Sequence, residues 1–162
     1  YGWSKNRCSS WFFAIDSFWL CPIIIIFKKM ITSEIIKIAS NTNNVGLTNK
    51  YTFKSFKKNS MCGDLIKIEL ISANSKINSM RYETESCVYC EASASLLAKK
   101  IKTMPIKIIK KELNHLKDSI VNKVNFNFHK KFEEFKFLIN KKNFKRINCI
   151  LLPIEAVLKA LK

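Results

Sequence analysis

Apolar and polar positions alternate in two stretches of the chain, and this period of two is typical of β-strands. The first stretch spans residues 64–72 and the second spans residues 76–84, with the turn-forming sequence Ala-Asn-Ser-Lys between them. If the two strands pair as an antiparallel hairpin, Ile66, Leu70 and Tyr82 share one face. The pattern therefore predicts a small antiparallel sheet with one face free to pack against helices.

Elsewhere the apolar residues recur at the spacing of helices. This spacing predicts helices over about residues 32–40, 105–124 and 131–139, a further helix that begins at or just after Cys87, and a C-terminal helix that opens at Cys149.

Two local features refine this pattern. Residues 41–60 are rich in Asn, Thr, Ser and Lys and contain Gly46, so we expect an irregular loop there. Pro153 is expected within the first turn of the last helix, where a missing backbone N–H is tolerated. The order of elements predicts an α+β domain, with a small antiparallel sheet and helices packed on one side of it.

The composition is that of one globular domain. Of the 162 residues, 48% are hydrophobic and 25% are charged, which is enough to bury a core without disulfides. Residues 1–29 differ in composition from the rest of the chain, because they contain a long apolar run from Trp11 to Phe27. An aspartate and a proline interrupt this run, so it makes a poor membrane span. A sound helix opening follows Met30. We therefore interpret residues 1–29 as a non-native upstream extension, or else a weak apolar segment, and residues 30–162 as the domain.

The formal net charge is +17, a value compatible with binding to nucleic acid or to an anionic membrane. Only Arg7, Arg81 and Arg146 among the 29 basic residues are arginine, and the lysines occur with abundant Ile, Asn and Phe. Arginine forks and a clustered aromatic platform, which nucleic-acid recognition usually needs, are not evident. We therefore expect a solvated basic surface, with neither nucleic acid nor a membrane as the partner.

The cysteines provide the candidate chemistry. There are six, and without a convincing secretory signal they indicate thiols of a reducing cytoplasm. Cys62, Cys87 and Cys149 each lie where a loop meets a strand or a helix, and side chains at such positions can converge. Asp64 follows two residues after Cys62, and Gly63 gives the backbone freedom between them. Three thiolates and one carboxylate suit tetrahedral zinc or an iron–sulfur cluster with one non-thiolate ligand, although the spacing alone fits three unrelated buried thiols equally well.

Three segments combine these cysteines with further motifs. They are MCGDLIKIEL (residues 61–70), SCVYCEASASLLA (residues 86–98) and CILLPIEAVLKAL (residues 149–161). They contain a Cys-Gly-Asp triplet, a cysteine followed by an Ala-Ser-x-Ser block, and a cysteine that opens an amphipathic helix. In this combination the chain resembles the iron–sulfur cluster assembly scaffold family that includes IscU, the N-terminal domain of NifU, and SufU. The resemblance covers about residues 31–162 and implies a fold of the SufE/IscU type.

The SufU-like branch fits better than the IscU-like branch. Cys87 and Cys149 are 62 positions apart, and the Lys-rich stretch of about residues 105–124 corresponds to the insertion that SufU-like proteins carry between these cysteines. Arg146 also resembles an arginine of SufU-like proteins. Asn148 stands where IscU-like members usually have a histidine, and the Leu-Pro-Pro-Val-Lys chaperone-docking motif is absent.

The resemblance implies a protein of iron–sulfur cluster assembly in the bacterial cytoplasm. It implies Cys62 as the sulfur acceptor, Arg146 as a supporting charge, and Cys62, Asp64, Cys87 and Cys149 as ligands of Zn²⁺ or a [2Fe–2S] cluster. The implied partners are a SufS-like cysteine desulfurase and recipient apo iron–sulfur proteins or carriers. The chain would be a scaffold or a sulfur carrier, and sulfurtransferase-like at most. Because a carboxylate is a harder and weaker partner for iron than a thiolate, Asp64 would keep the site labile.

Other residues have simpler interpretations. Cys90 forms a C-x-x-C pair with Cys87, but without a βαβ context it is expected to be a small helix-packing residue rather than a resolving thiol or a spare ligand. His115 and His129 stand in Lys-rich surroundings and are expected at the surface. The Phe-rich residues 126–137 have near-helical spacing and are expected in the core, with a partner-docking face as the alternative.

A second class of function remains open at this point. The chain could be a basic, zinc-stabilised binding module for nucleic acid or a membrane surface, in which the cysteines serve structure only. A structural zinc site is closed and buried, and its loss unfolds the domain, whereas an assembly site is reachable from solvent. Solvent access to the cysteines therefore discriminates between the two functions.

Overall fold

The computed structural model describes residues 31–122 and 129–162, and Ser33–Lys162 form one compact unit. The segment before residue 31, which includes the expected upstream extension, lies outside the described residues. So do the last positions of the helix expected over residues 105–124 and the first part of the Phe-rich segment.

A three-stranded antiparallel sheet in the order β1-β2-β3 forms one layer of this unit. β1 spans Phe53–Lys58, β2 spans Leu65–Ala73 and β3 spans Lys76–Glu85. The hairpin predicted between β2 and β3 is confirmed, with Ala73 opposite Lys76. Asn74 and Ser75 between them have φ values of 51° and 59°, as a tight turn with two left-handed residues requires.

β1 lies in the stretch that the sequence predicts as an irregular loop, so this prediction is wrong and the predicted two-stranded sheet gains a third strand. The usual hydrophobic alternation is inverted in β1. Ser55 and Lys57 point inward, where Ser55 Oγ donates to the carbonyl of Ala156 at 2.7 Å and Lys57 forms an ion pair with Glu155. Phe56, between them, is 46% exposed. Because polar residues occupy the inward positions, the strand carries no apolar period of two.

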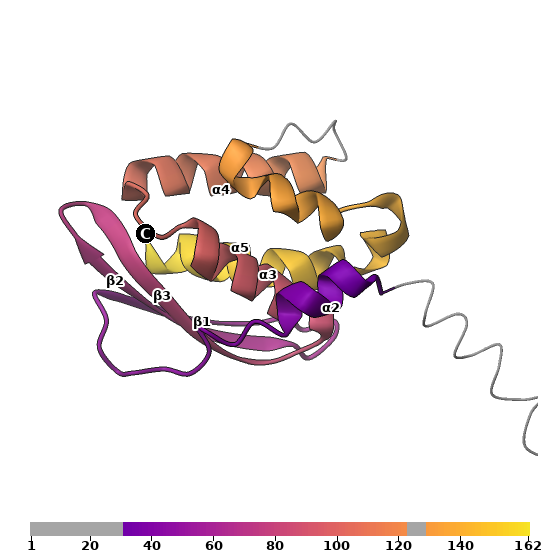
Figure 1. Cartoon of the computed structure of the whole chain (residues 1–162), viewed down its shortest axis with the longest axis horizontal. Coiled ribbons are helices and arrows are strands. Elements are labelled where there is room, and N and C mark those ends of the chain that lie inside the picture. Colours follow the sequence, from indigo (N-terminus) through magenta and orange to yellow (C-terminus); the bar gives the residue numbers. More distant parts are fainter. Residues whose placement is uncertain (1–30, 123–128) are drawn as a thin grey trace, which may run out of the picture. The chain divides into compact units, whose positions relative to one another are not determined.

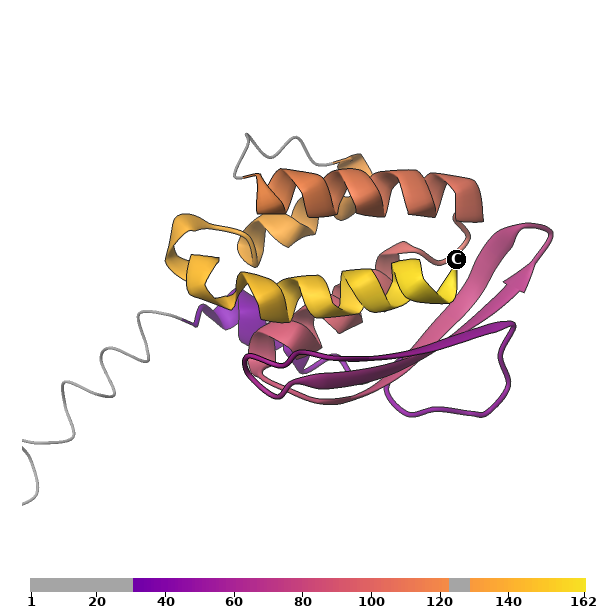
Figure 2. The ribbon, with the colours of Figure 1, turned by 180° about the vertical axis from the view of Figure 1, so that it is seen from behind.

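Helices cover one face of the sheet (Figures 1 and 2). α3 (Val88–Lys100) packs against β3, and α5 (Ile147–Ala160) packs against β1 and β2. α2 (Ser33–Ala39) contacts α3, and α4 (Ile106–Val121) lies on α5 as an outer layer. The predicted α+β class, with a small antiparallel sheet and helices on one side, is thus confirmed.

Two short 3₁₀ helices lead into α5. They are η1 (Lys130–Phe137) and η2 (Lys141–Arg146), and η1 replaces the helix expected over residues 131–139. Phe132 and Phe135 of η1 are buried, as predicted for the Phe-rich segment, whereas Phe137 is partly exposed.

Pro153 lies deeper in α5 than predicted. The helix begins at Ile147, so Pro153 is its seventh residue and not part of its first turn. Because proline has no N–H, the carbonyl of Cys149 receives no i to i−4 bond from this position. Leu152 and Ile154 on either side are buried, and this packing compensates for the missing bond.

Within residues 31–122 and 129–162, none of the helices combines the length and the apolar character needed to cross a bilayer.

Candidate metal centre

The loop between β1 and β2 positions two of the predicted ligands. The N–H of Asn59 donates to the carbonyl of Asp64 at 2.8 Å, and the N–H of Gly63 donates back to the carbonyl of Asn59 at 2.9 Å. Gly63 has a φ of +75°, a left-handed value that favours glycine. The Cys62 and Asp64 side chains therefore converge through a closed turn, which uses the backbone freedom expected of Gly63.

Asn59 is a site residue that the sequence analysis missed. Its side-chain Oδ1 also accepts from the N–H of Met61 at 3.0 Å, so it organises the loop from within. The stretch from Asn59 to Asp64 has the Asn and Gly content of a hairpin loop. That signal becomes readable only once β1 is recognised as a strand.

Cys149 brings the third ligand from the first turn of α5. Its Sγ lies 3.5 Å from Sγ of Cys62, and the ligand atoms of Cys62, Asp64 and Cys149 all lie within 4.8 Å of one another. Cys62 is exposed, while Asp64 is 5% exposed and Cys149 is 3% exposed. The site therefore has one thiol at the surface above a buried thiol and a buried carboxylate.

One oxygen of the Asp64 carboxylate has no hydrogen-bond partner among the described residues. Oδ1 accepts from the N–H of Cys87 at 3.1 Å, whereas Oδ2 is buried and accepts no hydrogen bond from the described residues. Burial alone would raise the pKa of Asp64, but the nearby thiols of Cys149 and Cys62 and the N–H of Cys87 outweigh it, so the pKa is lowered. A buried, charged oxygen without a partner beside two thiols is a donor set that fits a cation.

Cys87 is the fourth predicted ligand and lies beside this group rather than in it. It occupies the N-cap position of α3, is half-buried, and binds Asp64 through its backbone. Its thiol is close enough to help lower the pKa of Asp64 and to raise that of Cys149.

Burial is the main cause that raises the pKa of the Cys149 thiol, and the carboxylate of Asp64 adds to it. A bound cation would offset both effects, because it would stabilise the thiolate form of Cys149.

The Ala-Ser-x-Ser block positions α3 against the element that carries Cys149. Ser93 Oγ donates to the carbonyl of Ile150 at 2.7 Å, one residue after Cys149. Ser95 Oγ donates to the carbonyl of Asn41 at 3.3 Å. The two alanines of the block are fully buried. The block therefore supports the site through packing and hydrogen bonds, and it supplies no ligand.

Arg146 immediately precedes α5 and is exposed. Its charge reaches the buried hydroxyl of Tyr89, where it opposes the burial that raises the pKa of this tyrosine. The Tyr89 hydroxyl donates to Oδ1 of buried Asn143 at 3.1 Å and so joins the start of α3 to η2. Sequence analysis missed this pair, because an asparagine in an Asn-rich chain gives no distinct signal.

The remaining candidates lie apart from the group. Cys90 is fully buried in the core, as predicted for a packing residue, and burial raises the pKa of its thiol to about 12. His115 and His129 are exposed, also as predicted. His129 Nδ1 accepts from the N–H of Lys131 at 3.3 Å and caps η1.

Two solved structures illustrate the fold that this chain shares with known proteins. The N-terminal part of a nitrogen-fixing NifU-like protein from Brucella abortus superposes with a TM-score of 0.74 at 15% identity, covering 84% of this chain and 94% of that one. A putative iron–sulfur cluster assembly scaffold protein for the SUF system from the thermophile Fervidobacterium islandicum AW-1 gives a TM-score of 0.70 at 19% identity, covering 83% of this chain and 98% of that one. At these identities the likeness concerns the fold.

Among curated proteins, none matches the chain significantly. The sequence profile described as NifU-like N terminal domain matches residues 30–125, which is more than half of the 162 residues. The chain therefore belongs to the NifU-like N-terminal domain family.

Proposed function

We propose that the chain is an iron–sulfur cluster assembly protein. It accepts sulfur from a SufS-like cysteine desulfurase at Cys62, and it holds Zn²⁺ or a nascent [2Fe–2S] cluster at Cys62, Asp64, Cys87 and Cys149 for recipient apo proteins or carriers. The observation that carries this proposal is the gathering of the Cys62, Asp64 and Cys149 ligand atoms within 4.8 Å in a site that opens to solvent at Cys62. Family membership and the fold shared with a putative SUF-system scaffold support it.

The exposure of Cys62 suits it to receive sulfur. The Cys62 thiolate attacks the outer sulfur of the donor's cysteine persulfide, a new S–S bond forms at Cys62, and the donor cysteine leaves as thiolate. No net oxidation occurs, because one persulfide replaces another. Asp64 and Cys149 lie below this thiol and are shielded from the partner.

The ligand set would supply negative charge and soft sulfur donors to the bound metal. Asp64 already presents a charged, unpartnered oxygen, and Cys87 is tied to it through the backbone. Arg146, the exposed residue that immediately precedes α5, is the proposed supporting charge on the strength of the family resemblance. The proposed functional domain comprises residues 30–162.

The exposure of the Cys62 thiol also helps to distinguish an assembly site from the alternative, a structural zinc module. A purely structural site is closed, and all its ligands are buried. Cys62 is exposed, which favours an assembly site over a structural one.

A persulfide-transfer assay tests the proposal. The chain is incubated with a SufS-type cysteine desulfurase and L-cysteine, and the mass of each cysteine-containing peptide is then measured. We expect one added sulfur atom on the peptide that contains Cys62, no addition in Cys62→Ser, and wild-type transfer in Cys90→Ser. Sulfur on another cysteine, or transfer that survives Cys62→Ser, would exclude Cys62 as the acceptor.

A further inference from the structure

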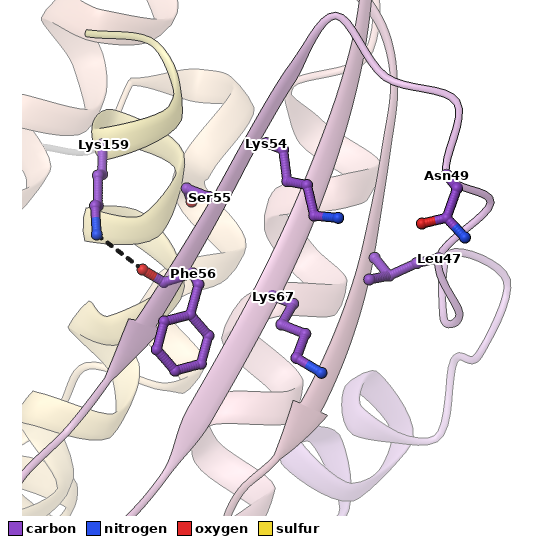
Figure 3. Close-up of a pocket in the computed structure, with 7 residues that line it drawn as sticks. All are labelled: Leu47, Asn49, Lys54, Ser55, Phe56, Lys67 and Lys159. Carbon is purple, nitrogen blue, oxygen red and sulfur yellow. Dashed lines mark hydrogen bonds between the residues drawn. The ribbon is translucent and has the colours of Figure 1, made fainter.

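The face of the sheet that bears no helix contains a hollow of about 680 Å³ (Figure 3). We call it the lysine trough, and the lining residues used here are Leu47, Asn49, Lys54, Phe56, Lys67 and Lys159. Figure 3 shows Lys54 on β1 pointing toward Leu47 and Asn49 of the preceding loop, Lys67 on β2 beside it, and Phe56 and Lys159 on the other side. The trough thus runs between a loop and the end of α5, with two strands as its floor.

The trough has an unbalanced positive charge. Lys54, Lys67 and Lys159 come from three different elements, and none of them forms an ion pair with a carboxylate among the described residues. Lys159 Nζ donates to the carbonyl of Phe56 at 3.1 Å, and Lys54 Nζ lies 5.1 Å from the centre of the Tyr51 ring.

Two carboxylates lie opposite trough lysines in the strand pairing, Glu69 opposite Lys54 and the exposed Glu83 opposite Lys67. Glu83 Oε1 accepts from the N–H of Leu47 at 3.3 Å, and Glu83 forms no ion pair with a lysine among the described residues.

Glu69 is buried. Its Oε2 accepts from the N–H groups of Thr48 at 2.9 Å and Asn49 at 3.1 Å, so it holds the loop that forms one wall of the trough. The lysines are therefore free to receive acidic groups from outside.

Exposed apolar side chains accompany the lysines. Tyr51 is 50% exposed, Phe56 is 46% exposed and Met61 is 81% exposed, and they are spaced along the segment that forms β1 and ends beside Cys62. Large apolar side chains within a polar rim are typical of protein–protein interfaces. A free anion would leave these side chains in water, whereas a partner protein would bury them.

We propose that the lysine trough docks an acidic, extended segment of a partner protein, with glutamate or aspartate side chains on Lys54, Lys67 and Lys159 and an apolar side chain on Phe56. Charge complementarity carries the proposal, and the exposed phenylalanine selects a peptide over a simple anion. Nucleic acid fits less well, because the lining contains one aromatic residue and no arginine. This docking surface is distinct from the metal ligands and does not depend on their chemistry.

Fluorescence anisotropy tests the proposal with the full chain. The probe is a labelled peptide in which two leucines are flanked by glutamates. We expect saturable binding that weakens with salt, and a dissociation constant at least about tenfold higher for the double variant Lys54→Glu/Lys67→Glu. The matched control is Lys107→Glu/Lys111→Glu on the exposed face of α4, which makes the same change in net charge and should shift the constant less than about twofold.

Several outcomes would overturn the proposal. Equal weakening in both double variants would reduce the effect to net charge, and absence of saturable binding would exclude the peptide. Displacement of the peptide by inorganic phosphate or by a single-stranded oligonucleotide at lower concentration would assign the trough to those ligands instead. Metal content is measured on the same samples, so loss of the metal site is separable from loss of docking.

Discussion

Cys62 and Asp64 are separated by a single glycine, yet their surroundings are opposite. The thiol is exposed, whereas the carboxylate is buried with one oxygen bound to the N–H of Cys87 and the other without a partner among the described residues. Left-handed Gly63 produces this contrast, because it turns the chain inward between the two side chains. At the scale of residues, the site therefore separates an exposed thiol from a buried carboxylate and a buried thiol.

Replacement of Asp64 tests the buried oxygen. Asp64→Asn keeps an acceptor for the N–H of Cys87 but removes the charge that a cation needs. We expect zinc affinity to fall by about tenfold or more, measured by competition with a chromogenic chelator. Asp118→Asn, at an exposed position of α4, should leave the affinity unchanged. Equal affinities of Asp64→Asn and wild type would remove Asp64 from the ligand set.

The sequence identified these residues but not how they are brought together. The Cys-Gly-Asp triplet carries the recognisable motif, and Gly63 is needed for its geometry as predicted. The supporting residues Asn59, Tyr89 and Asn143 act through hydrogen bonds that form only in the folded chain. Tyr89 and Asn143 lie far apart in sequence, so no local pattern indicates their pairing, whereas the bonds of Asn59 are local and become readable only once β1 is recognised as a strand.

At the scale of elements, the site depends on the polar contacts that hold α3, α5 and β1 together. Ser93 links α3 to α5 beside Cys149, and Ser55 links β1 to the carbonyl of Ala156 on α5. Glu155 receives Lys57 from β1 and Lys117 from α4. These polar contacts fix the elements from which the ligands project.

Removal of the α3–α5 hydrogen bond should weaken the fold without removing a ligand. Ser93→Ala eliminates the donor to the carbonyl of Ile150, and we expect the free energy of unfolding to fall by about 1 kcal/mol. Urea denaturation of the metal-free protein measures this loss. Ser119→Ala on α4 is the control and should cost less than about 0.5 kcal/mol. A variant at Ser93 as stable as the control would show that the bond contributes nothing.

The Glu155 ion pairs predict a specific pH dependence. Burial would raise the pKa of Glu155, but Lys57 and Lys117 outweigh it and lower the pKa below its ordinary value of 4.5. A lowered folded pKa means that the pairs stabilise the fold above about pH 4.5, and that this contribution is lost as the pH falls through the folded pKa. We expect Glu155→Gln to cost about 1 kcal/mol at pH 7, with the difference from wild type vanishing in acid.

Denaturation curves of both proteins between pH 7 and pH 3 measure this difference. Glu85→Gln, at the exposed end of β3, serves as the control. A Glu155→Gln deficit that persists unchanged at the lowest pH would attribute the effect to packing rather than to charge.

β1 is the strand that the sequence pattern did not predict. Its inward residues are Ser55 and Lys57, whose roles are set by α5, about a hundred positions later. The β2–β3 hairpin, by contrast, follows from local alternation and from a turn, and both lie within the twenty-one residues from Leu65 to Glu85. Pairing within a hairpin is readable from sequence, whereas an edge strand stabilised by a distant helix is not.

At the scale of the whole molecule, the two faces of the sheet differ in what covers them. One face is covered by helices and ends at the candidate metal centre, and the other carries the lysine trough. The net charge of +17 does not show where a partner would bind, because the basic residues are spread over the whole sequence. The fold concentrates three of the lysines around an exposed phenylalanine, and that concentration is what the sequence could not reveal.

The central claim is that Cys62, Asp64, Cys87 and Cys149 form a metal or cluster site. Its most direct test is zinc, iron and acid-labile sulfide analysis, with a visible spectrum, of the full chain purified without oxygen, for wild type, Cys149→Ser and Cys90→Ser. The account predicts either about one zinc per chain without sulfide, or iron and sulfide in equal amounts, retained in Cys90→Ser and lost in Cys149→Ser. A folded wild-type protein without metal or sulfide, or a Cys149→Ser variant that keeps the full amount, would contradict it.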